Sequence, residues 1–256
     1  MIRASVSNEG ERLSKRVMQL KGCSRREAEQ YIEGGWVTVD GVVVEDPPFR
    51  VLKQTVRVAA DATLLGAESV TLLLHKPPDW LDGVEEDQGG KGKSARQLLT
   101  PLSHWPQDGS DIRVLKRHFN HLSSDVPLET GASGLLVFTQ DWRTRRKLSE
   151  DIGSMEHELV ADVAGEVSEE AMQRITRALK DSRNPLPPTK FSVGSTSPER
   201  SKLRFAVKGA HPGLVAHLCE RGRLTLLALR RIRLGRVALS DLPVGQWRYL
   251  ASFEKF

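Results

Sequence analysis

The sequence predicts an α+β protein with a small first unit and a larger second one. Near the start, two short helical patterns precede an alternating apolar and polar segment that is typical of a hairpin. Further along, strand-like and helix-like runs mix without the regular strand–helix–strand repeat of a doubly wound sheet. The 256 residues suffice for a large domain and a small one, and the 39% of apolar residues can form a core.

The first helices are delimited by their own polar residues. Residues 1–8 are polar, and we expect a disordered tail there. A first helix over residues 12–20 has its apolar positions on one side. Ser24 and Glu27 form a capping box, in which each side chain accepts a hydrogen bond from a free amide of the first turn. A second helix therefore begins at Ser24.

Glycines mark the next boundaries. Gly34 and Gly35 end the second helix, and Asp40-Gly41 is typical of the tight turn of a hairpin. The first unit is therefore expected to cover residues 9–58.

The second unit is expected to follow a linker at residues 59–69 and to cover residues 70–256. Residues 82–96 are polar and rich in glycine, which predicts a flexible loop. The remaining pattern predicts strands at 70–74, 134–139, 190–195, 202–207 and 225–234, and helices at 143–152, 168–180 and 212–221.

Positive charge is concentrated in two places. The net charge is +5, and the stretch 199–236 holds ten Lys or Arg residues against two acids. Such a cluster is either an ordinary solvated face or a second surface that contacts phosphate. In the first unit, six basic residues lie on the two helices, where free helix-start amides also favour phosphate oxygens. Either this is an ordinary solvated helix pair, or it contacts phosphate through Arg12, Lys15, Arg16, Lys21, Arg25 and Arg26.

Several other classes of protein do not fit the composition. No run of 18 apolar residues exists, so we expect no membrane contact. The start of the chain lacks the apolar core of a secretory signal, and only two cysteines are present, which favours a reducing cytoplasm. The seven histidines do not form a zinc frame, so we expect no metal and no cofactor. The chain is expected to act as a monomer.

The segment RLSKRVMQLKGCSRREAEQYIEGGWVTVDGVVV resembles the small RNA-binding domain named after ribosomal protein S-four. The resemblance covers about residues 11–58 and rests on R-L-S-K, C-S-R-R-E-A and the glycine-bounded hairpin. In that family the basic face of the two helices grips structured RNA by its shape and phosphates. The resemblance implies that the main contacts are Arg12, Lys15, Arg25 and Arg26.

The rest of the chain resembles the catalytic domain of RsuA/RluF-type ribosomal RNA pseudouridine synthases. Three segments carry the resemblance: LLLHKPP, LETGASGLLVFTQD and ALRRIRLGRVALSDLPVGQWRYL. It implies a central, mainly antiparallel sheet and an isomerase that converts uridine in structured, ribosomal RNA without metal or cofactor. It also implies a cleft in which Lys76, Arg230 and Arg231 contact RNA beside one carboxylate.

Four positions depart from the family pattern. Glu129 stands where the family has its catalytic aspartate, and Pro127 replaces the arginine before it. Leu159 replaces a tyrosine that packs against the target base, and residues 209–216 retain none of the arginines of a third motif. An extra methylene displaces the carboxylate by about an ångström, and such a misplacement lowers a rate by about a hundredfold. Lost cations remove the groups that hold the carboxylate charged and oriented.

Three functions follow as hypotheses. The first is an RNA-binding member of this family with weak or lost synthase activity. The second is an active uridine isomerase that flips its target base into the cleft and uses Glu129 or Asp125 as the carboxylate. The third is a protein-binding scaffold whose basic surface is incidental. RNA affinity that falls steeply with salt separates the first two from the third.

Overall fold

The computed structural model describes residues 10–64 and 69–256. The chain divides into two compact units. Of the described residues, unit 1 comprises 10–64, 69 and 113–120, and unit 2 comprises 70–112 and 121–256. The expected tail at 1–8, and part of the expected linker, lie outside the described residues.

Two helices of unit 1 begin and end as the sequence predicts. They are α1 (Leu13–Lys21) and α2 (Arg25–Glu33). The capping box is confirmed, because the Ser24 amide donates to Glu27 Oε2 at 2.7 Å and the Glu27 amide donates to Ser24 Oγ at 3.3 Å. The second of the two glycines after α2, Gly35, adopts a left-handed φ of 71° that favours glycine.

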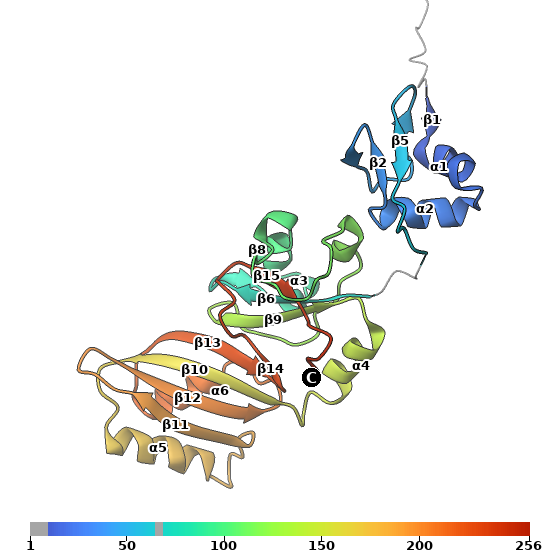
Figure 1. Cartoon of the computed structure of the whole chain (residues 1–256). Helices are drawn as coiled ribbons and strands as arrows, with labels where there is room; N and C mark the ends of the chain where they lie inside the picture. The colour runs from blue at the N-terminus through green and yellow to red at the C-terminus, as the bar shows by residue number, and fades with distance from the viewer. Residues whose placement is uncertain (1–9, 65–68) are drawn as a thin grey trace, which may run out of the picture. The chain divides into compact units, whose positions relative to one another are not determined.

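The helices of unit 1 pack against short strands (Figure 1). Asp40 and Gly41, with φ of 50° and 83°, form the tight turn between β2 and β3. A buried cluster joins the helices to the strands: Leu13, Val17, Ala28, Ile32, Val37, Val39 and Val51. The strands are β1 (Glu11–Arg12), β2 (Val37–Val39), β3 (Val42–Val43), β4 (Arg50–Val51) and β5 (Val56–Val58).

A distant segment, residues 113–120, also belongs to unit 1. It contains a short 3-10 helix, η3 (Lys116–Phe119). The Lys116 amide donates to Glu45 Oε2 at 2.7 Å, and Leu115 is buried. A Cβ atom on Gly35 would lie 2.9 Å from Leu115 Cδ2, so the close approach requires glycine. Nothing in the sequence predicted this packing.

Unit 2 is built on an eight-stranded sheet whose main path runs β11-β12-β10-β13-β9-β6-β15, with β14 paired to β13 (Figure 1). Only β13 and β9 pair in parallel within it, so the mainly antiparallel α+β fold is confirmed. The strands are β6 (Thr71–Lys76), β9 (Ser133–Thr139), β10 (Glu156–Ala164), β11 (Thr189–Ser195), β12 (Arg200–Lys208), β13 (Leu226–Leu234), β14 (Val237–Ala238) and β15 (Trp247–Tyr249).

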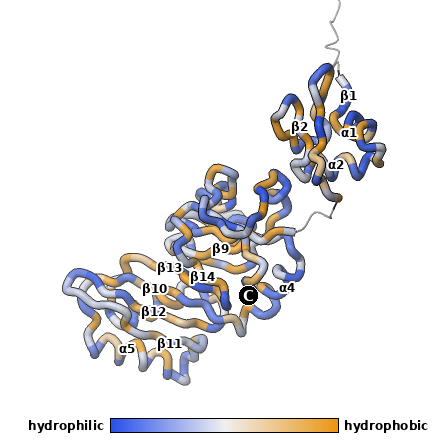
Figure 2. Tube along the Cα trace, in the orientation of Figure 1, coloured by the Kyte–Doolittle hydropathy of each residue, from blue (hydrophilic) through white to orange (hydrophobic). Residues whose placement is uncertain are grey.

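Three helices accompany this sheet, close to their expected positions. They are α4 (Trp142–Glu150), α5 (Glu169–Leu179) and α6 (Leu214–Arg221). Leu148 of α4 joins the buried cluster of β6 and β9, and Figure 2 shows the hydrophobic character of β9. Among the described residues, none of the helices is both long and apolar enough to cross a membrane.

Two expectations for unit 2 do not match the structure. The prediction of a flexible loop at 82–96 is wrong. This stretch contains regular elements whose ends are fixed by buried side chains. Strands β10 and β15 were not predicted. The elements of this region are β7 (Trp80–Leu81), α3 (Gly83–Asp87), β8 (Lys93–Ser94), η1 (Ala95–Leu98) and η2 (Pro101–Ser103).

Candidate active-site pocket

The parallel pairing of β9 with β13 depends on one glycine. Gly134 has a φ of +116°, and a Cβ atom there would lie 2.2 Å from the carbonyl oxygen of Arg231. No other residue permits this approach without moving a strand. The pairing brings Arg231 beside the loop that precedes β9, which carries residues 127–132.

Arg231 is a buried cation that holds this loop. Its side chain donates from Nε to the Leu135 carbonyl and from Nη1 to the Pro127 carbonyl, both at 2.8 Å. Within the described residues its Nη2 is buried and has no hydrogen-bond partner. Burial lowers the pKa of Arg231 to about 10, and the negative charges of Glu129 and Asp82 oppose that shift. The guanidinium therefore lies in the field of the Glu129 carboxylate.

Lys76, the last residue of β6, is a second buried cation. Its Nζ donates to the carbonyl of Trp80 at 2.7 Å, to that of Thr130 at 3.0 Å and to that of Pro77 at 3.2 Å. Burial lowers the pKa of Lys76 to about 8, while Asp82 and other nearby acids oppose the shift. All three donors of the ammonium group are thus committed to backbone.

The expectation that Lys76 and Arg231 contact RNA phosphates does not fit this geometry. Both are almost fully buried, at 0% and 1% exposure, and both bind carbonyl groups of the same loop. Arg230, the third residue predicted beside them, is exposed, because successive strand residues point to opposite faces. Of the three, only Arg230 is accessible to a phosphate.

Asp82, at the start of α3, fixes the other side of the loop. It is fully buried and accepts from the Leu128 amide at 2.5 Å and from the Glu85 amide at 2.6 Å. Glu85 in turn accepts from Thr130 Oγ1 at 2.5 Å. Sequence reasoning missed Asp82, because it lay in the predicted flexible loop.

Glu129 projects from this loop toward the start of α6. The Gly213 amide donates to Glu129 Oε1 at 3.4 Å. Gly213 is the N-cap residue of α6 and has no side chain to cap the helix, so Glu129 supplies a carboxylate at the positive end of the helix dipole. The extra methylene of glutamate extends its reach toward that helix end.

A small pocket, with a cavity volume of about 20 Å³, lies over Glu129. Each of the four departures from the family pattern contributes to its wall, the stretch 209–216 through five of its residues. The lining residues are Pro127, Leu128, Glu129, His157, Leu159, Val207, Gly209, Ala210, His211, Pro212, Val215 and Arg231. Four segments far apart in the sequence therefore form one site.

Comparisons with known proteins find similar chains and a similar fold. Residues 11–56 match the family model of the S4 domain. An uncharacterized RNA pseudouridine synthase of Aquifex aeolicus is 25% identical over 246 residues, which are 95% of this chain and 94% of the relative. Ribosomal small subunit pseudouridine synthase A of Vibrio cholerae is 26% identical over 250 residues, covering 95% and 97% of the two chains.

Two further matches extend the comparison. Ribosomal large subunit pseudouridine synthase B of Pseudomonas aeruginosa is 27% identical over 256 residues, or 93% of this chain and 59% of that relative. A crystal structure of a pseudouridylate synthase shares the fold, with a TM-score of 0.53 and 18% identity over 94% of this chain and 96% of the other. The chain is similar to RNA pseudouridine synthases along nearly its whole length.

A histidine also lines the pocket. His157 is on β10 and is 3% exposed, between Val207 of β12 and Leu234 of β13. Burial lowers the pKa of His157 to about 3, and the charge of Arg231 adds to that shift. The ring is therefore neutral at physiological pH. Its Nε2 is buried and lacks a hydrogen-bond partner among the described residues.

Asp125, the spare carboxylate of the second hypothesis, lies elsewhere. Its Oδ2 is 3.2 Å from Nε of Arg145 on α4, and Asp125 is not among the pocket-lining residues. The structure thus offers Glu129 alone of the two carboxylates to a ligand in the pocket.

The S4 domain displays most of its predicted RNA-binding residues on the surface. Arg25 pairs with Glu29 at 2.8 Å, and Lys21 Nζ lies 5.7 Å from the centre of the Tyr31 ring. Arg16 is half-buried and bonded to Glu11. Three exposed cations form no ion pair with any described residue: Arg12, Lys15 and Arg26.

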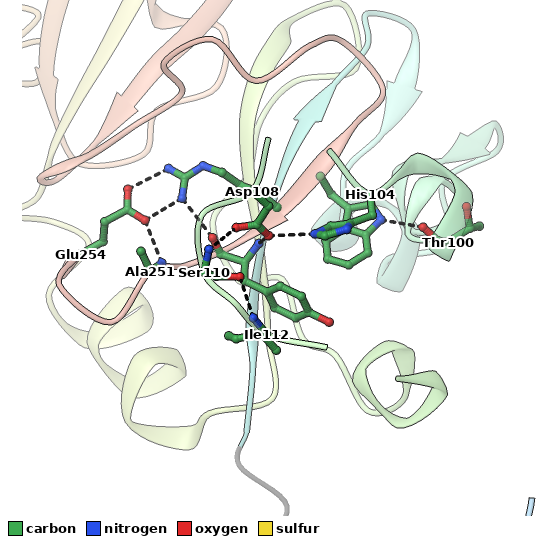
Figure 3. Close-up of polar contacts among 10 residues, drawn as sticks. Thr100, His104, Asp108, Ser110, Ile112, Ala251 and Glu254 are labelled. Atoms are coloured by element: carbon green, nitrogen blue, oxygen red, sulfur yellow. Dashed lines mark hydrogen bonds and ion pairs between the residues drawn. The ribbon is translucent and has the colours of Figure 1, made fainter. Parts of the chain in front are cut away.

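The densest polar cluster of unit 2 is structural (Figure 3). Asp108 accepts from the ring of His104 at 2.8 Å and from the Tyr249 amide at 2.9 Å. These hydrogen bonds lower the pKa of Asp108 although burial opposes them. Arg248 pairs with Glu254 at 2.6 Å. The cluster anchors β15 to the distant loop that carries His104 and Asp108, and it contributes no residue to the pocket.

Proposed function

We propose that this chain binds structured RNA, specifically ribosomal RNA, and that its synthase activity is weak or lost. The observation that carries the proposal is the pocket itself, because Pro127, Glu129, Leu159 and five residues of the stretch 209–216 line it together. A single replacement can be compensated by neighbours, whereas these replacements change the carboxylate, its neighbouring residue, the base platform and the helix start at once. The proposal rests on the family pattern for the role of each position.

RNA binding is supported by two features. Residues 11–56 match the S4 domain, and its two helices expose basic side chains around the start of α2. The relatives in Vibrio cholerae and Pseudomonas aeruginosa are named for the small and the large ribosomal subunit. These names support ribosomal RNA as the partner without selecting a subunit or a uridine.

Weak catalysis is supported by the geometry around Glu129. Its carboxylate reaches the amide of Gly213 and thus serves α6 as a cap. Leu159 offers an aliphatic surface, which lacks both the aromatic face and the hydroxyl of tyrosine. The side chain that would attack or deprotonate a base is therefore engaged by a helix end, and the base has no ring to pack against.

One observation favours the second hypothesis, an active synthase that uses Glu129. The sequence suggested that the orienting cations had been lost, yet Arg231 lines the same pocket and is influenced by the Glu129 charge. A buried guanidinium with a free Nη2 is suited to orient a carboxylate or to stabilise negative charge on a uracil. Residual activity is therefore compatible with this pocket.

Mapping of pseudouridine in ribosomal RNA tests the proposal. Cells with and without the gene are compared, and the deletion strain is complemented with wild type, Glu129→Ala or Asp125→Asn. We expect the same sites in all strains. Asp125→Asn is the matched control, because this carboxylate pairs with Arg145 outside the pocket. A site that disappears on deletion, returns with Asp125→Asn and stays absent with Glu129→Ala would establish an active enzyme.

A binding measurement tests the RNA partner separately. The affinity for ribosomal RNA is measured at several salt concentrations, and a steep fall is expected because released counterions drive phosphate binding. Affinity that is absent even at low salt would favour the scaffold hypothesis instead.

A further inference from the structure

Four strands of unit 2 present one exposed surface on the side opposite the pocket. We call it the open sheet face, and it comprises the outward side chains of β10, β11, β12 and β13. Along β12 exposed and buried residues alternate, so Lys202 and Arg204 point outward while Leu203 and Phe205 point into the core. Leu159 and Arg231 of the pocket belong to the inward set.

The strand register places basic side chains side by side on this face. Arg204 of β12 lies opposite Val160 of β10, and Val160 lies opposite Arg230 of β13. Directly paired residues share a face, so Arg204 and Arg230 flank the short Val160 side chain across roughly 10 Å. Lys202 follows two residues along β12, roughly 7 Å away.

Acidic residues on the central strand neutralise only part of this charge. Asp162 pairs with Arg200, and Glu158 pairs with Arg204 at 2.9 Å. Arg233 pairs with Glu156 and Glu158 at 2.5 and 2.8 Å. Four further cations of the face are exposed and form no ion pair with any described residue: Lys190, Lys202, Lys208 and Arg230.

The charged and non-aromatic side chains of the open sheet face indicate which form of nucleic acid it can bind. The open sheet face carries seven cations and three acids. The acids are Glu156, Glu158 and Asp162. The outward side chains between the charges are Ser192, Val160, Ala206 and Ala228, and none is aromatic. Single-stranded nucleic acid is usually held by stacking of bases on aromatic rings, whereas double-stranded RNA is held through its phosphates and shape.

We propose that the open sheet face binds the phosphate backbone of a double-helical RNA segment, distinct from the segment that supplies a base to the pocket. This inference rests on the proposed RNA-binding function and adds a second contact surface with a stated preference. Binding through phosphates is independent of base sequence. The logarithm of affinity falls linearly with the logarithm of salt concentration, and the slope is proportional to the number of phosphates contacted.

Full-length variants with matched charge changes test this inference. The face variant carries Lys190→Gln, Lys202→Gln and Arg230→Gln. The control variant carries Arg177→Gln, Lys180→Gln and Arg183→Gln near α5, so both lose three charges at exposed positions. Each protein is titrated with a duplex RNA of about 20 base pairs and with one of its strands, at several salt concentrations. Thermal melts verify that the variants are folded.

We expect the face variant to lower the salt slope for the duplex by about 2 to 3, at roughly 0.9 per phosphate, with at least about tenfold weaker binding. The control variant should lower the salt slope for the duplex by less than about 1. Should the triple variant not fold, Lys202→Gln alone is expected to lower the slope by about 1.

Two results would overturn the inference. Equal slopes for the face and control variants would show that only net charge matters, and a larger effect on the single strand would contradict the duplex preference. Both leave the proposed function intact, because wild-type binding persists. Absence of RNA binding by the wild type would instead remove the proposed function along with this surface.

Discussion

Basic side chains are exposed on the S4 domain, whereas they are buried around the pocket of unit 2. In the S4 domain, Arg12, Lys15 and Arg26 extend into solvent without an ion-pair partner among the described residues. Around the loop 127–132, which borders the pocket, Lys76 and Arg231 are buried and bind backbone carbonyls. The first arrangement leaves charge available to a phosphate, and the second uses charge to shape a loop.

Under the proposed function, this difference accounts for one region that keeps the family pattern and another that departs from it. Phosphate binding depends on the number and exposure of cations, and it tolerates small displacements. Catalysis depends on the position of one carboxylate to within about an ångström. A chain under selection for RNA binding alone therefore keeps the first region and lets the second change, provided that the fold survives. The buried cations of the pocket maintain that fold.

The largest effect is expected from reversing charge at the start of α2. The double variant Arg25→Glu/Arg26→Glu should weaken binding to ribosomal RNA by about a hundredfold and lower the salt slope by about 2. Both side chains are exposed, so the fold should persist. A filter-binding titration at several salt concentrations measures the effect.

The control for this variant is Lys53→Glu/Arg57→Glu, which reverses two exposed charges elsewhere in the same unit. It should change the affinity much less. If both double variants weaken RNA binding equally, the start of α2 is not the RNA contact. The exposed cations of the S4 domain would then not differ in function from other surface charges.

The next effect concerns the scaffold of the pocket. Asp82→Ala removes the acceptor of the Leu128 and Glu85 amides and should lower the free energy of unfolding by about 2 kcal/mol. Asp87→Ala, at an exposed carboxylate of the same helix, should stay within about 0.5 kcal/mol of wild type. Denaturant unfolding of both variants measures the difference. Equal values for the two would show that Asp82 does not hold the loop.

Local features were predicted from the sequence, and non-local ones were not. The capping box at Ser24 and the turn at Asp40 depend on neighbouring residues, so the sequence contains all their determinants. Strand β10 alternates buried and half-buried residues, a signal that was present but overlooked among its polar letters. The docking of residues 113–120 onto unit 1 depends on tertiary contacts and has no local signal.

The pocket was predictable in part. The resemblance to the pseudouridine synthase family singled out Pro127, Glu129 and Leu159, and the structure brings these positions together. It did not reveal that Arg231 points inward, because the strand pattern alone does not give the face of a charged residue. Nor did it reveal Asp82, whose partners lie 3 and 46 residues away.

A smaller effect on the free energy of unfolding is expected when the pH is lowered. The pKa of His157 is about 3 because of burial, against about 6.5 in an unfolded chain. Above pH 6.5, His157 is neutral in both the folded and the unfolded state. It therefore contributes nothing to the pH dependence of stability there. As the pH falls below about 6.5, the unfolded state binds the proton first, so the free energy of unfolding decreases until the folded pKa is reached. At pH 5.5 the loss is about 1.4 kcal/mol.

His157→Gln should reduce the decrease of stability between pH 7 and pH 5.5 by this amount, as measured by denaturant unfolding at the two values. His118 of unit 1, whose pKa burial lowers to about 4, provides the same test for the other region through His118→Gln. His217→Gln, at an exposed ring, serves as the control. An unchanged pH dependence in His157→Gln would show that this ring is not kept neutral by the pocket.

The smallest effect is expected from restoring the family's carboxylate. Glu129→Asp should change pseudouridine formation on ribosomal RNA by less than about tenfold. The shorter side chain withdraws from the Gly213 amide, and Arg231 remains as an orienting cation, but Leu159 still offers the base no aromatic ring. The missing platform therefore limits the rate more than the missing aspartate does.

The double variant Glu129→Asp/Leu159→Tyr separates these contributions, with Leu159→Tyr alone as its matched control. Leu159 is 9% exposed at the pocket wall, so the larger ring must extend into the pocket, where a base would pack against it. We expect the double variant to exceed both single variants in product formed, because the carboxylate and the platform act on the same base. If Glu129→Asp alone raises the rate by about a hundredfold or more, the extra methylene is the main defect. The pocket would then be a nearly intact active site with one altered residue, and the contrast with the S4 domain would reduce to that single position.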